Sequence, residues 1–117
     1  MNVTEIVENL PAHVVYGAPG YQNLEIRRII AGDLMSDILV TVENDALLVT
    51  SLATEQAIRC ADMIGATAIL LVNDKLPVPG MKVLAEDCGI TLLATPMPMY
   101  ESCVALGRFS EFDEPAS

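Results

Sequence analysis

The sequence predicts a single compact α/β domain with a mostly parallel sheet and flanking helices. Three short apolar segments of strand-like composition recur in the second half of the chain, at 46–50 (ALLVT), 66–72 (ATAILLV) and 90–95 (ITLLAT). Each segment is almost continuously apolar rather than alternating, which is typical of strands that are covered on both faces. Because helical patterns separate the segments, right-handed crossovers would place the three strands side by side and parallel.

Two amphipathic helices are predicted between these strands. The apolar residues of 57–64 and of 81–88 recur at the i, i+3, i+4, i+7 spacing of one helix face. Gly65 and Gly89 follow the two segments, at the position where a glycine commonly ends a helix. Pro79 suits the first turn of the second helix.

A last helix is predicted near the end of the chain. It covers 99–106 and ends at Gly107. The remaining residues, 108–117, are acidic and without apolar periodicity, so we expect a mobile tail after a domain that covers 1–107.

The first half of the chain is less regular. Residues 3–10 fit a short amphipathic helix, with Asn2 and Glu5 at the spacing of a capping box. Strands are predicted at 12–16 and 24–30, on either side of a GAPG turn.

Composition narrows the class of protein. Of the 117 residues 52% are apolar, more than one core of this size needs, so we expect apolar faces that are buried between subunits. The net charge of −10, from 16 acidic against 6 basic residues, disfavours binding to nucleic acid or to anionic membranes. Arg27 and Arg28 are the only adjacent basic pair.

Cysteine usage and the N-terminus predict a cytoplasmic protein. Cys60, Cys88 and Cys103 are odd in number and widely spaced, which is typical of reduced, buried thiols. No set of four ligands at the usual spacing supports a zinc site, and no other cofactor is predicted. The N-terminus lacks the pattern of a signal peptide, and no apolar run approaches the roughly 20 residues of a membrane span. His13 has no catalytic partner at a recognisable spacing, so we expect it to be structural or solvated.

The order and spacing of several segments resemble the DRTGG-domain family. These segments are AGDLMSDIL at 31–39, LLVTS at 47–51, AILLV at 68–72, PVPGMKVLAE at 77–86 and GITLLAT at 89–95. The string GDLMSD is the most specific of them, and the resemblance extends to about Gly107. The chain looks most like the small stand-alone members, which are described as similar to the N-terminal, regulatory domain of HPr kinase.

The resemblance implies a compact α/β fold related to the N-terminal domains of HPr kinase and of Mur ligases. DRTGG domains are attached to phosphotransacetylases and to CBS-containing pyrophosphatases, where they are regulatory or dimer-forming. Small stand-alone members accompany iron-hydrogenase genes and sensor kinases. The family brings no established set of catalytic residues.

The chain departs from the family at the residues that give the family its name. The Asp-Arg pair would fall at Ala53 and Thr54, and the Thr-Gly-Gly at 72–74, where this chain has Val-Asn-Asp. Two glycines that would let a ligand approach the backbone are lost, and Asp74 would face an anion, so a phosphate-cradling role is weakened. The P-loop pattern GxxxxGK[ST] is absent, so kinase activity is not implied.

Ligands of open parallel sheets collect beyond the carboxyl ends of the strands. In this sequence those ends carry polar residues, and these are the candidate ligand-binding set: Thr50, Ser51, Thr54, Asn73, Asp74 and Thr95. They would hydrogen-bond a small polar ligand, and the helix after Ser51 would favour an anionic group at its N-terminus. The same residue types also cap helices and form turns, so a purely structural role for each is the alternative.

The segment 33–43 fits both a helix and a strand, and we favour a helix. Within it, Asp33, Ser36 and Asp37 are candidates for a family signature or a subunit interface. Two carboxylates four residues apart would also hold a cation or share a proton. An acidic residue in a first turn more commonly interacts with the helix dipole, so no metal site is assigned.

Together these features predict a non-enzymatic regulatory or accessory module that forms a homo-oligomer, with a dimer favoured. It would bind a small metabolite or nucleotide, or a partner protein such as a hydrogenase-associated or sensor-kinase system. The alternative is a small enzyme with a pocket at the carboxyl ends of the strands, in which Asp33, Asp37 or Asp74 acts as acid or base. A third possibility is a purely structural assembly subunit. No nucleophile–base pair or metal-ligand set is recognisable, which disfavours the enzyme.

Overall fold

The computed structural model describes residues 1–33, 38 and 44–109. Its helices and strands follow the chain in this order: α1 (Val3–Asn9), β1 (His13–Tyr16), the 3₁₀ helix η1 (Tyr21–Asn23), β2 (Arg28–Ala31), β3 (Ala46–Thr50), α3 (Glu55–Ile64), β4 (Ala66–Leu71), α4 (Pro79–Cys88), β5 (Thr91–Ala94) and α5 (Met99–Phe109).

The sheet has five strands in the order β1-β5-β4-β3-β2. The four strands β2, β3, β4 and β5 run parallel to their neighbours, and β1 pairs antiparallel with β5 at one edge. This arrangement confirms the predicted α/β class with a mostly parallel sheet. Because the parallel strands share one direction, their carboxyl ends lie along the same edge of the sheet. We call this edge, with the residues that directly follow β2 to β5, the carboxyl edge.

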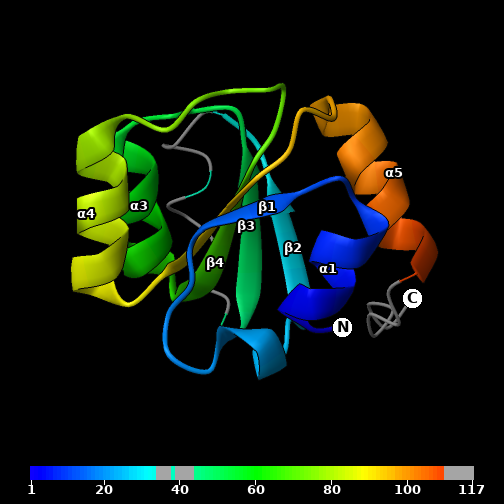
Figure 1. Cartoon of the computed structure of the whole chain (residues 1–117), viewed down its shortest axis with the longest axis horizontal. Coiled ribbons are helices and arrows are strands. Elements are labelled where there is room, and N and C mark those ends of the chain that lie inside the picture. Colours follow the sequence, from blue (N-terminus) through cyan, green and yellow to red (C-terminus); the bar gives the residue numbers. More distant parts are fainter. Residues whose placement is uncertain (34–37, 39–43, 110–117) are drawn as a thin grey trace.

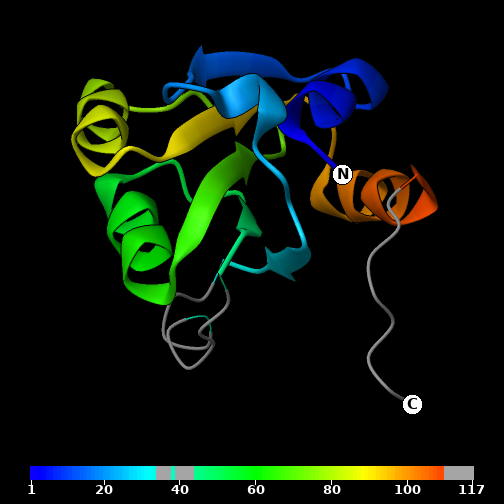
Figure 2. The same cartoon turned by 90° about the horizontal axis from the view of Figure 1, so that it is seen from below.

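Helices cover both faces of the sheet, as Figure 1 shows with α3 and α4 on one side and α1 and α5 on the other. The view from below gives the same two layers around the sheet (Figure 2). Successive residues of β3 therefore reach different cores: Leu48 packs on the side of α3 and α4, whereas Leu47 and Val49 pack on the side of α1 and α5. All five residues of β3 are buried, which explains why the strand is continuously apolar in sequence.

The predicted helix ends are confirmed at two glycines. Gly65 and Gly89 follow α3 and α4 with φ values of 85° and 69°, in the left-handed region that glycine adopts without a steric penalty. The predicted end of the last helix is wrong, because α5 continues through Gly107 to Phe109. A glycine inside a helix costs about 1 kcal/mol relative to alanine but does not forbid the helix. Residues 110–117 of the predicted tail lie outside the described residues.

The predicted strand at 24–30 is wrong in its bounds, because only Arg28–Ala31 joins the sheet. The preceding residues pair with the N-terminus instead: the Ile26 amide donates to the Met1 carbonyl at 2.7 Å, and Asn2 forms an antiparallel bridge with Glu25. The segment of strand-like composition therefore pairs with the N-terminus in its first part and with β3 in its second part. The predicted helix at 33–43 falls mostly outside the described residues.

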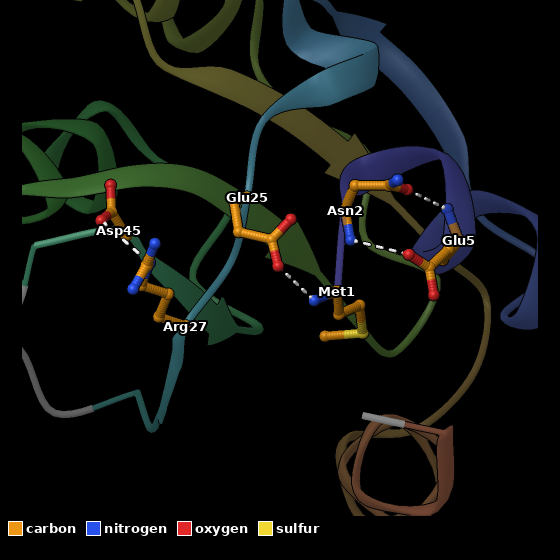
Figure 3. Close-up of polar contacts among 6 residues, drawn as sticks. All are labelled: Met1, Asn2, Glu5, Glu25, Arg27 and Asp45. Atoms are coloured by element: carbon orange, nitrogen blue, oxygen red, sulfur yellow. Dashed lines mark hydrogen bonds and ion pairs between the residues drawn. The ribbon is translucent and has the colours of Figure 1, made fainter. Parts of the chain in front are cut away.

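Polar contacts fix the N-terminal segment against the domain (Figure 3). The Met1 ammonium lies 2.7 Å from the Glu25 carboxylate, and this contact lowers the pKa of Glu25. The predicted capping box of α1 is present, with the Asn2 side chain accepting from the Glu5 amide at 2.9 Å and the Glu5 carboxylate accepting from the Asn2 amide at 3.2 Å.

The three thiols are free in the structure. Cys60 is buried, Cys88 and Cys103 are half-buried, and burial raises the pKa of each thiol. His13 is exposed on β1, as expected of a solvated residue. Within the described ranges, no helix has the length and apolarity to cross a bilayer, and no group of three metal-ligating side chains gathers.

Candidate ligand-binding site

The ends of β2 and β3 are joined by one carboxylate. Past the end of β2 the Gly32 amide still donates to the Val49 carbonyl at 3.0 Å, which carries the chain alongside β3 to Asp33. There Asp33 Oδ1 accepts from Thr50 Oγ1 at 3.0 Å and from the Ser51 amide at 2.7 Å. Its second oxygen, Oδ2, accepts from Ser51 Oγ at 2.6 Å. Asp33 therefore extends the pairing of β2 with β3 beyond the ends of both strands.

These contacts set the charge of Asp33. Partial burial alone would raise its pKa, but hydrogen bonds from Ser51 and Thr50, together with the charge of Lys75, outweigh it, so the pKa of Asp33 lies below its usual value. Asp33 is thus an anion at neutral pH and a weak proton acceptor, which does not suit a general base. Lys75, on the loop after β4, is the cation that acts on this carboxylate across the carboxyl edge.

At the ends of β4 and β5, backbone hydrogen bonds join the segment after β4 to the segment after β5. The Asn73 amide donates to the Met97 carbonyl at 2.9 Å, and the Asp74 amide donates to the Thr95 carbonyl at 3.2 Å. The Asn73 side-chain oxygen accepts from the amide of Met99, the first residue of α5, at 3.1 Å. This polar side chain therefore caps a helix.

Thr95 is engaged in the same way. Its side chain is buried, and its hydroxyl donates to the Pro11 carbonyl and accepts from the Met97 amide, each at 3.2 Å. Both hydrogen-bonding functions of the hydroxyl are thus used inside the fold. They connect β5 to the turn before β1 and to the segment before α5.

Asn73 and Asp74 have left-handed backbone conformations, with φ values of 62° and 57°. These are the two positions at which the resemblance to the DRTGG family places consecutive glycines. Glycine adopts such φ values freely, and asparagine and aspartate tolerate them better than other side chains do. The loop therefore has a backbone shape suited to glycines, although it carries two side chains there.

Thr54 lies at the N-terminus of α3 but does not cap this helix with its side chain. It is the N-cap residue of α3 and exposed, yet its hydroxyl makes no hydrogen bond to the first turn of the helix. The N-terminus of α4 is in a different situation, since the Glu55 carboxylate lies against Gly80. A β-carbon at Gly80 would approach Glu55 Oε2 to 2.8 Å, so the anion already occupies the first turn of α4.

The structure thus brings together three of the predicted residues in direct contact: Asp33, Thr50 and Ser51. The link from Asp33 to the strand ends was missed in the sequence, although Asp33 follows the predicted strand 24–30 by only three residues. Lys75 was missed as well, and its place next to Asp74 was the available signal. Ser36 and Asp37 lie outside the described residues.

Comparison with known proteins identifies the fold. No family model matches the sequence, and no curated protein matches it. The structure is similar to the crystal structure of the CBS and DRTGG domains of the regulatory region of Clostridium perfringens pyrophosphatase, complexed with the activator diadenosine tetraphosphate. The TM-score is 0.64 at 10% sequence identity, and the match covers 90% of this chain and 45% of that chain. The chain therefore has a DRTGG-like α/β fold, as the sequence resemblance implied, and it spans less than half of the structure that it matches.

Proposed function

We propose that this chain is a cytoplasmic regulatory or accessory module that binds a small metabolite or nucleotide at the β2–β3 part of its carboxyl edge and works as a homodimer. The observation that supports it best is the position of Asp33, Ser51 and Thr54 around the end of β3. Carboxyl ends of parallel strands are the usual ligand position of open α/β sheets. The regulatory character is supported by the likeness to the regulatory region of the pyrophosphatase.

The chemistry of this part of the edge favours a ligand with both polar and anionic groups. The Thr54 hydroxyl is exposed at the start of α3, and the Ser51 hydroxyl donates to Asp33 but keeps acceptor capacity. The Lys75 ammonium supplies a positive charge, while Asp33 supplies a fixed negative one. A nucleotide, which combines hydroxyl and amino groups with phosphate, fits this mixture better than a bare inorganic anion.

The enzyme alternative has less support. Asp33 accepts three hydrogen bonds and has a lowered pKa, so it is a poor acid or base near neutral pH. A binding module needs no such group, because its ligand changes only the stability or the assembly of the protein.

A thermal-shift screen tests the proposal. We expect one compound in a panel of nucleotides, acyl phosphates and coenzyme A derivatives to raise the unfolding midpoint in proportion to its concentration. Thr54→Val should reduce this shift without lowering the midpoint of the free protein. The matched control is Thr67→Val at the start of β4, on the opposite edge of the sheet, which should leave the shift unchanged. A shift that survives Thr54→Val would place the ligand elsewhere.

A second candidate function is docking on a partner protein, for example a hydrogenase-associated or sensor-kinase system. It is favoured by Tyr100, which is 76% exposed on the first turn of α5, because tyrosine is enriched at protein interfaces. Tyr100→Ser should then weaken binding to the purified partner and leave the thermal shift by nucleotides unchanged.

A further inference from the structure

A small apolar pocket lies between α1, β1 and η1, away from the carboxyl edge. Its volume is about 250 Å³, below the roughly 300–1,000 Å³ of typical small-molecule sites, so it suits one or two side chains better than a metabolite. Val7, Val14 and the Tyr21 ring give it an apolar interior, and Glu8 lies at its wall. The full lining is Thr4, Val7, Glu8, Val14, Tyr21 and Gln22.

The loop between β4 and α4 carries exposed apolar side chains that could fill such a pocket. Leu76 is 83% exposed and Val78 is 42% exposed, and they alternate with Pro77 and Pro79. The base of the loop is held by the hydrogen bonds of Asn73 and Asp74 to the segment that follows β5. Prolines and a fixed base reduce the conformational entropy that such a loop would lose on binding.

The loop and the pocket lie in different parts of the molecule: the pocket is formed along the edge strand β1, between α1 and η1, whereas the loop joins β4 to α4. The loop follows β4 at the carboxyl edge, whereas β1 runs antiparallel to β5 and delivers η1 to the edge where the parallel strands begin. In Figure 1 the loop runs along the top of the molecule and η1 lies at the bottom. One copy therefore cannot place its own loop in its own pocket. Two copies that lie side by side in opposite directions can exchange both contacts at once.

We propose that Leu76 of each copy inserts into the α1–β1–η1 pocket of a second copy of this chain, which gives a two-fold symmetric dimer with two identical contacts. Charge supports this occupant. Lys75 adjoins Leu76, and Glu8 lies at the wall of the pocket, so each insertion brings a cation to an anion. Because the chain carries a net charge of −10, two copies repel each other unless local pairs of this kind offset the repulsion.

This inference rests on the homodimer in the proposed function and deepens it by naming the contact surface. The loop shares Lys75 with the proposed ligand site, whereas the pocket that receives Leu76 contains none of the candidate ligand-binding residues. A monomeric protein would overturn both the homodimer and this contact. A dimer that does not depend on Leu76 would overturn only the contact.

Substitution of the inserted side chain is the first experiment. Sedimentation or light scattering over a range of concentrations should show a dimer whose dissociation constant rises by roughly tenfold or more in Leu76→Asp. The matched control is Met63→Asp, which places the same charge at an apolar residue that is 72% exposed on α3. It should leave the dissociation constant within about twofold of the wild type, because α3 is not part of the contact. Equal weakening by both variants would overturn the proposal.

Exchange of the two charges is the second experiment, and both residues are exposed, so neither substitution disturbs the core. Lys75→Glu and Glu8→Lys should each weaken the dimer, since each places like charges at both contacts. An equimolar mixture of the two variants should recover the dimer, because every contact then pairs a lysine with a glutamate. The recovery should diminish at high salt. Absence of recovery in the mixture at low salt would overturn the proposed contact.

Discussion

The two halves of the carboxyl edge carry similar residues but use them differently. At the ends of β4 and β5, Asn73 and Thr95 bond to the chain around Met97 and close that half. At the ends of β2 and β3, Asp33 and Ser51 bond to each other across two strands, and Thr54 beside them does not cap its helix. The difference arises from the path of the chain after each strand. Thr50 at the end of β3 is buried and accepts from the Leu52 amide, much as Thr95 accepts from the Met97 amide, so the exposed Thr54 beyond that strand end is the residue left available to a ligand.

We call the ends of β4 and β5 the closed half and the ends of β2 and β3 the open half. The closed half should contribute more to the free energy of unfolding. Thr95 is buried, and Thr95→Val removes the hydroxyl that bonds to the Pro11 carbonyl and to the Met97 amide, so two part-buried hydrogen bonds are lost. We expect a loss of about 1–3 kcal/mol in the free energy of unfolding, measured by urea denaturation. Thr54→Val, in the open half, should change it by less than about 0.5 kcal/mol. Similar losses in the two variants would remove the distinction between the halves.

Asp33 provides an intermediate effect, because it joins two strands but is partly exposed. Asp33→Asn removes the negative charge that attracts the hydroxyl and amide donors of Thr50 and Ser51. After allowance for solvent screening, we expect a loss of about 1 kcal/mol at neutral pH. Hydrogen exchange should show faster opening at the Ser51 amide and unchanged exchange at the Asp74 amide.

The effect of Asp33 should depend on pH in one direction. The pKa of Asp33 is lower in the folded protein than the usual value near 3.9 of an unfolded chain. Its charge therefore stabilises the fold fully at pH values above the unfolded pKa, and this contribution is lost as the pH falls through the folded pKa. The stability difference between wild type and Asp33→Asn should be constant from about pH 5 to pH 7 and decrease below about pH 4. A difference that grows on acidification would contradict the hydrogen-bonded carboxylate.

The fold was predictable because its signals are local. The continuously apolar segments around β3, β4 and β5 and the glycines at 65 and 89 each act within one strand or helix. The predictions were wrong where residues distant in the sequence determine the hydrogen-bond partners of a segment. Residues 24–27 pair with Met1 and Asn2 rather than with the sheet, and this competition between partners leaves no trace in the pattern of the segment itself.

The candidate site was predictable as a set of residues but not as a set of interactions. Parallel strands dictate that Thr50, Asn73 and Thr95 end at one edge, so their common location followed from the strand pattern. Which hydroxyl is engaged depends on the path of loops, and local sequence does not encode that path. The contact of Asp33 with Ser51 joins two separate crossover segments, and it becomes visible only when β2 is placed beside β3.

The smallest expected effect comes from the two left-handed residues of the closed half. Asp74→Gly should raise the free energy of unfolding by about 0.5 kcal/mol, because glycine relieves the strain at a φ of 57° but also makes the unfolded chain more flexible. Asn73→Gly relieves similar strain but loses the cap on the Met99 amide, so we expect a net loss of about 0.5 kcal/mol.

The difference between these two variants isolates the role of the Asn73 side chain, because the backbone change is nearly the same in both. Equal stabilisation by both would mean that the side-chain oxygen of Asn73 does not cap α5, and the closed half would then have a polar group available for a ligand.

Asp74→Gly also tests whether the Asp74 side chain is the only feature that excludes a ligand from the closed half. If this variant gains a thermal shift with a nucleotide to which the wild type does not respond, the negative charge at 74 keeps that nucleotide out of the closed half. If it does not, the hydrogen bonds around Met97 leave no room there, and any ligand is confined to the half around Asp33 and Ser51.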